Sequence, residues 1–198
     1  MRKLRILVIL ASPRKGNSAY AAKKFAKAVK GRKTFVDINK LRIKPCEACH
    51  KCARELKCKF DDDAAWLMAK VDEADVVIVA SPVYFTGVPG PLKTFIDRNQ
   101  LRWEQIQSGL RNPDSGNKGN THPVPRAPRH KKGIIILTAG SNSPKQFAPA
   151  ESEIRSFFAV NRIRTARVLK FGNMDEKGEM KKNKSALKKT AKAMMKNG

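Results

Sequence analysis

Runs of consecutive apolar residues alternate along this chain with stretches of helical periodicity. Leu4–Ala11, Ala74–Ala80 and Gly133–Ala139 are almost uninterrupted apolar runs, which is typical of strands buried on both faces of a sheet. Thr34–Ile38 and Thr165–Phe171 have a more mixed composition, and we expect them to be strands as well. The pattern therefore predicts five strands.

Five segments between and after these strands show the spacing of amphipathic helices. In the first of them, Ala21, Phe25 and Val29 share one face while lysines occupy the other. Asp61-Asp62-Asp63 precede the second, and we interpret them as carboxylates that cap a helix N-terminus rather than as a metal site. The predicted helices are Ser18–Lys30, Asp63–Val71, Gly90–Leu101, Ala148–Val160 and Glu179–Lys196.

This alternation predicts an α/β fold in which helices cover both faces of a doubly wound, five-stranded parallel sheet. Such sheets bind their ligands at the carboxyl ends of the strands. The loops after Ala11, Ala80 and Ala139 are therefore the places where we expect the chemistry.

Composition narrows the class of protein. The 198 residues suffice for one domain, and 41% of them are hydrophobic, which excludes a wholly disordered chain. We expect a single domain over residues 1–198 with a cysteine loop at 44–60, a basic Gly/Pro-rich insertion at 108–132 and a basic C-terminal helix. No apolar run approaches the roughly 18 residues of a membrane span, and no export signal is evident. We therefore expect a cytoplasmic protein whose cysteines are reduced.

The loop after the first strand has the features of an anion cradle. Small polar side chains and a glycine lead into the first predicted helix, whose N–H groups attract negative charge. An ordinary helix cap is the alternative interpretation. The candidate phosphate-binding residues are Ser12, Arg14, Asn17 and Ser18.

The loop after the third strand offers an apolar wall. Tyr84 and Phe85 stand beside Thr86 and Gly87, directly after a buried run, so aromatic surface and backbone donors lie together. This combination suits a planar heterocycle, whereas a tight hydrophobic turn is the alternative. Pro89 and Pro91 then open a helix, where proline is tolerated.

These two loops carry a family resemblance. The sequences Ser-Pro-Val-Tyr-Phe-Thr-Gly (81–87) and Leu-Lys-Thr-Phe-Ile-Asp-Arg (92–98), together with Ser12 and Asn17-Ser18, closely resemble the flavodoxin-like NAD(P)H-dependent FMN reductase superfamily. The resemblance implies a flavodoxin-like sheet of order 2-1-3-4-5 and bound FMN, with the phosphate on the first loop. It also implies NAD(P)H as a possible donor and a homodimer or homotetramer. The residues it places against the flavin ring are Pro82, Val83, Tyr84, Phe85, Thr86 and Gly87, with Thr138, Ala139 and Gly140 on the other side.

All four cysteines fall in one short loop, as Cys46-x2-Cys49-x2-Cys52-x5-Cys58. This compact spacing is close to the bacterial ferredoxin pattern and favours a [4Fe-4S] cluster, with all four thiols as ligands. A zinc site that includes His50 and a set of free thiols are the alternatives. Within the flavin superfamily the motif resembles the iron–sulfur flavoproteins of archaea and anaerobic bacteria, although some relatives hold similar cysteines without a cluster.

The charge suggests anionic partners, because 42 Lys and Arg stand against 17 Asp and Glu, a formal net charge of +25. Basic residues flank the cysteines, and we expect an acidic ferredoxin-like donor to approach them. The sequence thus predicts an oxidoreductase that passes electrons from that donor through a cluster to FMN and on to an acceptor. One alternative is an NAD(P)H-dependent FMN or quinone reductase without a cluster. Another is a basic RNA- or ribosome-associated protein on the same scaffold, with nucleic acid as the second-choice partner. The basic residues beside the cysteines are Lys44, Lys51, Arg54, Lys57 and Lys59.

Overall fold

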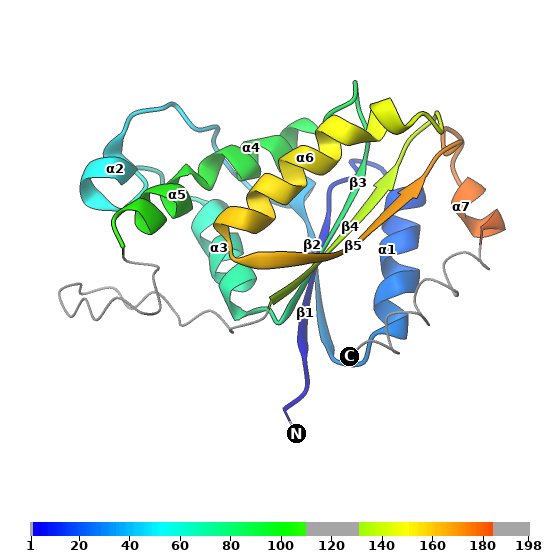
Figure 1. Cartoon of the computed structure of the whole chain (residues 1–198), viewed down its shortest axis with the longest axis horizontal. Helices are drawn as coiled ribbons and strands as arrows, with labels where there is room; N and C mark the ends of the chain where they lie inside the picture. The colour runs from blue at the N-terminus through cyan, green and yellow to red at the C-terminus, as the bar shows by residue number, and fades with distance from the viewer. Residues whose placement is uncertain (1, 110–130, 184–198) are drawn as a thin grey trace.

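The computed structural model describes residues 2–109 and 131–183 of the chain. Its strands form one parallel sheet in the order β2-β1-β3-β4-β5, which confirms the predicted order (Figure 1). The central strands β1 and β3 are buried on both faces, as their continuous apolar sequences require. The strands are β1 (Arg5–Leu10), β2 (Arg32–Asp37), β3 (Val76–Pro82), β4 (Lys131–Thr138) and β5 (Ile163–Phe171).

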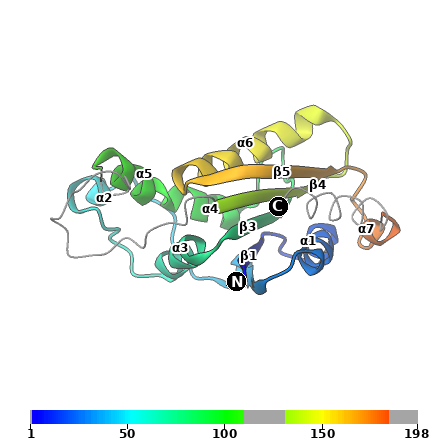
Figure 2. The same cartoon turned by 60° about the horizontal axis from the view of Figure 1, so that its bottom comes forward.

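Helices cover both faces of this sheet (Figure 2). One apolar core lies between the sheet and α3, α4 and α6, and it includes the edge-to-face pair Phe95 and Phe157. A second core joins the other face to α1 and α7, with Phe25 fully buried in it. The helices are α1 (Asn17–Ala28), α2 (Lys51–Glu55), α3 (Asp63–Glu73), α4 (Gly90–Arg98), α5 (Gln100–Gln107), α6 (Pro144–Val160) and α7 (Glu179–Lys182).

The edge strand β5 carries a register shift against β4 at Gly133/Ile134. A Cβ at Gly133 would lie 2.4 Å from the ring of Phe158, so only glycine lets α6 approach the sheet there. The shift and the glycine together set how closely α6 packs on this side of the sheet.

The structure refines the predicted elements at three places. The single predicted helix Gly90–Leu101 is two helices, α4 and α5, divided at Asn99. A short 3-10 turn at Ile38–Lys40 and the helix α2 were not predicted. Most of the insertion at 108–132 and of the predicted C-terminal helix lies outside the described residues. Within the part that is described, no helix is long and apolar enough to cross a membrane.

Candidate functional site

Three loops that the sequence singles out meet at the carboxyl edge of the sheet. The N–H of Ala11 donates to the carbonyl of Ala80 over 2.9 Å, and the N–H of Val83 donates to the carbonyl of Thr138 over 2.8 Å. These two bonds continue the ladders β1–β3 and β3–β4 beyond the strand ends. The loops after β1, β3 and β4 therefore lie side by side, as the prediction of a shared ligand site requires (Figure 1).

The loop before α1 is held by hydrogen bonds to its own backbone atoms. The hydroxyl of Ser12 donates to the carbonyl of Arg14 over 2.6 Å, and the carbonyl of Ser12 accepts from the amide of Asn39 over 3.0 Å. Ser18 is buried. No side chain among the described residues caps α1, and its first turn holds no acidic residue. This helix start therefore suits an anion such as the FMN phosphate.

Asn17 makes contacts that its sequence does not reveal. Its amide nitrogen donates to the carbonyls of Met174 and Glu176 over 3.0 and 2.8 Å. Its amide oxygen accepts from the N–H groups of Gly178 and Met180 over 3.1 and 3.2 Å. The Asn17 side chain thus holds the segment after β5 against the start of α1.

The loop after β3 ends in a two-residue hairpin. Tyr84 and Gly87 exchange both backbone hydrogen bonds at 3.0 Å. Phe85 and Thr86 lie between them with φ of 49° and 67°. Two positive φ angles in succession define a type I′ turn, which ordinarily takes Asn-Gly because larger residues are strained there. This turn holds an aromatic residue at its tip in spite of the strain, and Phe85 is fully exposed there.

Helix α6 supports this turn from behind. The carbonyl of Thr86 accepts from the N–H of Ala150 over 3.1 Å. The carboxylate of Glu153 accepts from the N–H of Val88 over 3.2 Å. Pro149 lies inside α6 directly before Ala150, and a proline within a helix disturbs the hydrogen bonds of its neighbours, which favours a donor that bonds outside the helix. The exposed turn is therefore fixed in place rather than loosely attached.

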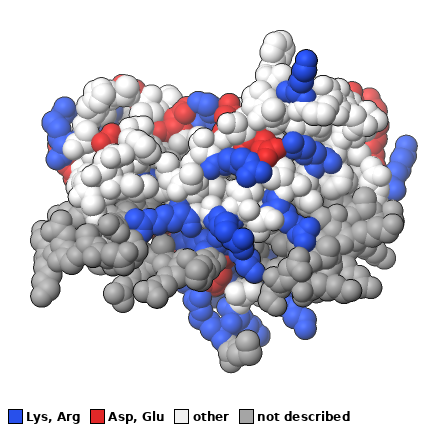
Figure 3. Space-filling model, viewed as in Figure 1, with Lys and Arg blue, Asp and Glu red and all other residues white. Residues whose placement is uncertain are grey.

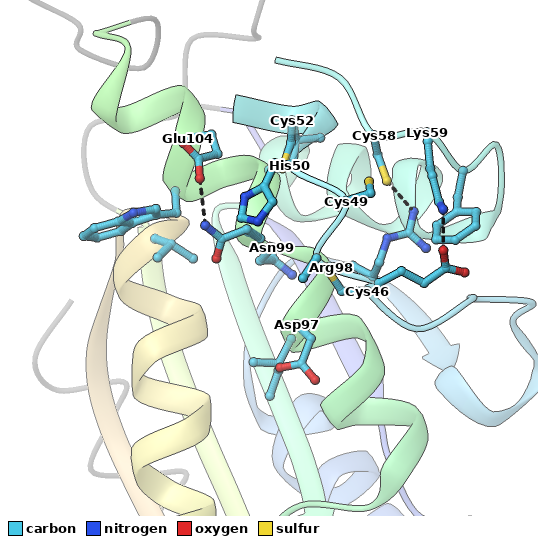
Figure 4. Close-up of a pocket in the computed structure, with 18 of the residues that line it drawn as sticks. Cys46, Cys49, His50, Cys52, Cys58, Lys59, Asp97, Arg98, Asn99 and Glu104 are labelled. Atoms are coloured by element: carbon cyan, nitrogen blue, oxygen red, sulfur yellow. Dashed lines mark hydrogen bonds and ion pairs between the residues drawn. The ribbon is translucent and has the colours of Figure 1, made fainter. Parts of the chain in front are cut away.

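The four cysteines line one cavity of about 630 Å³ at the other end of α4 (Figure 4). The cysteine loop forms one wall, the junction of α4 and α5 a second, and α6 a third. Helix α4 spans nine residues, or about 13 Å, between the hairpin turn and this cavity. The cavity is thus separate from the carboxyl-edge loops. Cys46 and Cys49 are exposed, whereas Cys52 and Cys58 are half-buried.

Arg98 is the central residue of this cavity. Its Nη1 contacts a carboxylate oxygen of Asp62 over 2.6 Å, and its Nη2 donates to the Cys58 Sγ over 3.2 Å. Nη1 also donates to the carbonyl of Lys44 over 2.8 Å, and the guanidinium lies 5.0 Å from the ring centre of Phe60. Burial alone would lower the pKa of Arg98, but the bond to Asp62 and the charge at Cys58 raise it, so Arg98 stays charged.

Other charges around the cavity are largely paired with one another. Lys51 lies 3.4 Å from the carboxylate of Glu55, and Lys59 forms an ion pair with Glu47. Burial raises the pKa of the Cys52 thiol, and the nearby negative charge of Glu104 adds to the effect. The basic residues next to the cysteines therefore present less free positive charge than the sequence suggests.

The four thiols are of the right chemical type for a soft metal centre, but in this structure they are not close enough together to bind one. All four thiols are free, and thiolates are the ligands that iron–sulfur clusters and zinc prefer. Arg98 adds a charged donor to one sulfur, and its buried Nε has no hydrogen-bond partner in the structure. In the described part of the chain, no three Cys, His, Asp or Glu side chains are gathered closely enough to hold a metal ion. The cysteine loop would have to close for all four sulfurs to ligate one group.

Comparison with known proteins identifies the family. The family model described as NADPH-dependent FMN reductase matches residues 4–143. The chain belongs to the NADPH-dependent FMN reductase family. This result confirms the resemblance drawn from the 81–87 and 92–98 sequences, and it agrees with the predicted class of oxidoreductase.

Curated relatives of this FMN reductase family member are named iron–sulfur flavoproteins. One from Methanocaldococcus jannaschii is 35% identical over 49% of this chain and 52% of the relative. One from Archaeoglobus fulgidus is 36% identical over 71% of this chain and 57% of the relative. The matches thus span only about half the length of these relatives. Among solved structures, a flavone reductase superposes with a TM-score of 0.69 at 18% identity, covering 96% of this chain and 62% of the other, which shows a shared fold.

The sequence identifies the three carboxyl-edge loops and the cysteine loop, but it does not predict that Arg98 and Asp62 join the cysteine loop to α3 and α4. Asp62 does cap α3, since its carboxylate accepts from the N–H of Ala64 over 3.1 Å. The ion pair between Asp62 and Arg98 connects residues 36 positions apart, and no local sequence pattern predicts it. The one signal in the sequence is Arg98 itself, at the end of the Leu-Lys-Thr-Phe-Ile-Asp-Arg motif that carries the family resemblance, and the motif predicts no partner for it.

Proposed function

We propose that this member of the FMN reductase family is an FMN-dependent redox protein of the iron–sulfur flavoprotein type. The observation that carries the proposal is the gathering of all four cysteines around one cavity that Arg98 joins to the end of α4. The names of the curated relatives support the same conclusion.

The flavin would lie at the carboxyl edge of the sheet. Ser12, Arg14, Asn17 and Ser18, with the free N-terminus of α1, would hold the phosphate. Asn17 would contribute its backbone N–H, because both atoms of its side-chain amide are already bonded to residues 174–180. The hairpin turn at Tyr84–Gly87 would lie against the ring together with Pro82 and Val83, and Thr138–Gly140 would close the other side. Bound FMN supplies chemistry that joins single-electron and two-electron steps. Protein groups here bind, orient and shield it, so no side-chain acid or base is assigned.

The cysteine loop would hold a [4Fe-4S] cluster with one thiolate on each iron. Arg98 would then donate a hydrogen bond to the ligand sulfur of Cys58, and such donors tune the potential of a cluster. An acidic ferredoxin-like protein is the donor we propose, and a homodimer or homotetramer is the assembly that the family resemblance suggests.

A second candidate is an NAD(P)H-dependent FMN or quinone reductase without a cluster. The observation that favours it is the spread of the cysteines, since no three side chains of ligand type are gathered for a metal in the described residues. In that case the thiols would remain free, and the flavin loops would carry the whole activity.

Anaerobic purification with assay of iron, acid-labile sulfide and flavin separates the two. We expect about four irons and one FMN per chain, and Cys58→Ala should remove most iron while FMN is retained. His50→Ala is the matched control, because His50 lines the same cavity but is not a proposed ligand. Full flavin with no iron in the unmodified protein would establish the second candidate. Stoichiometric zinc that His50→Ala abolishes would establish a zinc site instead.

A further inference from the structure

Basic residues mark the amino-terminal edge of the sheet, opposite the edge with the flavin loops. Strand β1 begins at Arg5, β2 at Arg32 and β4 at Lys131, and β5 begins between Arg162 and Arg164. Because all five strands are parallel, their starting points lie along one edge. Lys131 itself is buried, and its Nζ lies 3.8 Å from a carboxylate oxygen of Asp72, so β4 brings its charge to this edge through Lys132. Four of the five strands therefore bring positive charge to the same edge.

The register places some of these charges directly next to each other. Arg5 is paired with Arg32 across β1 and β2, and Lys132 is paired with Arg164 across β4 and β5. Neighbouring strands are about 4.8 Å apart, and like charges at that spacing repel. Arg32 and Arg164 are exposed, and Arg5 and Lys132 are half-buried, so an anion bound at this edge would reduce the repulsion.

Three acids before β3, Asp72, Glu73 and Asp75, compensate part of this charge. Asp75 pairs with Arg2 at 2.5 Å and with Arg5 at 3.9 Å. In the described part of the chain, no ion pair with an acid is formed by Arg32, Lys132 or Arg164.

A depression of about 200 Å³ opens at this edge, between α3 and the strands β1 and β2. Arg5, Arg32 and Lys70 line it, and Glu73 is the acid among its lining residues, paired with Lys70 at 3.1 Å. Trp66 lies one helical turn before Lys70 on α3 and is half-exposed. The hollow is thus cationic, and an exposed aromatic ring lies one helical turn away from it on α3.

Figure 3 shows the extent of this basic edge. Lys and Arg side chains gather over the lower half of the face drawn and at its lower end, where the strands of Figure 1 begin. Five strands at about 4.8 Å place these charges along about 19 Å, which is far longer than one phosphate group. A row of charges of this length suits a ligand with repeated phosphates.

We propose that the amino-terminal edge of the sheet binds the phosphate backbone of nucleic acid. Lysine and arginine side chains contact successive phosphates, and their binding releases counterions. Trp66 beside Lys70 supplies a stacking surface for an unpaired base, as in proteins that bind single strands. This surface lies at the opposite ends of the strands from the FMN loops, so its use is independent of the flavin.

The test measures binding of a fluorescein-labelled, mixed-sequence single-stranded RNA to the full chain by fluorescence anisotropy at several salt concentrations. In the triple variant Arg32→Glu, Lys132→Glu and Arg164→Glu we expect at least tenfold weaker binding. Its slope of log K against log salt should fall by about 2. The matched control reverses the same number of exposed charges on α1 and should weaken binding less than threefold. The control substitutions are Lys23→Glu, Lys24→Glu and Lys27→Glu.

Flavin content and thermal unfolding report whether each variant folds, and Gln replacements at the same three positions serve if the charge reversals do not. An equal loss in the edge variant and in the α1 variant would overturn the proposal in favour of diffuse attraction. Binding of anionic phosphatidylserine vesicles without binding of RNA would overturn it as well. So would RNA binding that does not respond to salt.

Discussion

The guanidinium of Arg98 lies between a carboxylate and a thiol, with Nη2 3.2 Å from the Cys58 Sγ and Nη1 2.6 Å from Asp62. Arg98 ends α4, Asp62 caps α3 and Cys58 belongs to the cysteine loop. One side chain therefore ties the cavity of the cysteines to two helices of the core. Because both charged side chains are almost completely buried, each depends strongly on the other.

Arg98→Met should destabilise the protein by about 3–5 kcal/mol, because it leaves the Asp62 carboxylate buried without its partner. Urea denaturation measures this change. Arg98→Met combined with Asp62→Asn should lose less than the sum of the two single changes. Lys93→Met removes an exposed ion pair with Asp97 from the same helix and should change stability by less than about 1 kcal/mol. Equal effects at Arg98 and Lys93 would contradict the assignment of Arg98 as a buried anchor.

Stability should depend on pH through Asp62. Burial alone would raise the pKa of Asp62, but hydrogen bonds from Arg98 and from the N–H groups of Lys44 and Ala64 lower it below its ordinary value of 3.8. A carboxylate with a lowered folded-state pKa stabilises the protein above its unfolded-state pKa and loses that effect as pH falls through the folded-state value. The stability deficit of Asp62→Asn should thus be full at neutral pH and shrink below about pH 3.9. If the stability difference between Asp62→Asn and the unmodified protein stays constant down to acidic pH, the charge of Asp62 does not stabilise the fold.

The hairpin turn offers a trade between stability and function. Replacement of Phe85-Thr86 by Asn-Gly relieves two strained positive φ angles and should stabilise the protein by about 1 kcal/mol or more. The same change removes the exposed aromatic ring, so we expect weaker retention of FMN on dialysis. Thermal unfolding and flavin absorbance measure the two effects. A variant that keeps both its flavin and its melting temperature would exclude a role for the strained turn.

Arg14→Glu should release FMN, because it puts a negative charge at the loop proposed to hold the phosphate. Arg14 is exposed and its guanidinium donates to the carbonyl of Asp175 over 2.9 Å, so we expect little loss of stability. Flavin content after gel filtration should fall at least tenfold. Lys23→Glu makes the same charge change farther along α1 and should leave the flavin in place. Normal flavin in both variants would remove Arg14 from the site.

The sequence predicted those parts of the fold that depend on local pattern. The apolar runs of β1, β3 and β4 are long enough to identify buried strands, and their order then places three loops at one edge. Beyond the boundaries of elements, what escaped prediction depends on contacts between distant residues. The division of α4 from α5 occurs at Asn99. Its side-chain amide donates a hydrogen bond to the carbonyl of Phe95 and accepts one from the side chain of Asn161. A helix pattern read along the chain contains no trace of the second of these bonds.

The conformation of the cysteine loop could not be predicted from the sequence either. The spacing of its cysteines predicts chemistry, but it does not say how the loop is oriented. Left-handed backbone at Ala48, His50 and Leu56 turns it back repeatedly, and α2 fills only five residues of it. These conformations are rare for such residues, so propensity could not have predicted them.

The Asn17 side chain donates two hydrogen bonds and accepts two, and these four bonds join the start of α1 to residues 174–180, more than 150 positions away in the sequence. If the two segments separate, four backbone groups lose their hydrogen-bond partner. In amide hydrogen exchange, the start of α1 and residues 174–180 should therefore open as one cooperative unit. Release of a ligand from the first loop and fraying of the chain after β5 would then share one rate constant.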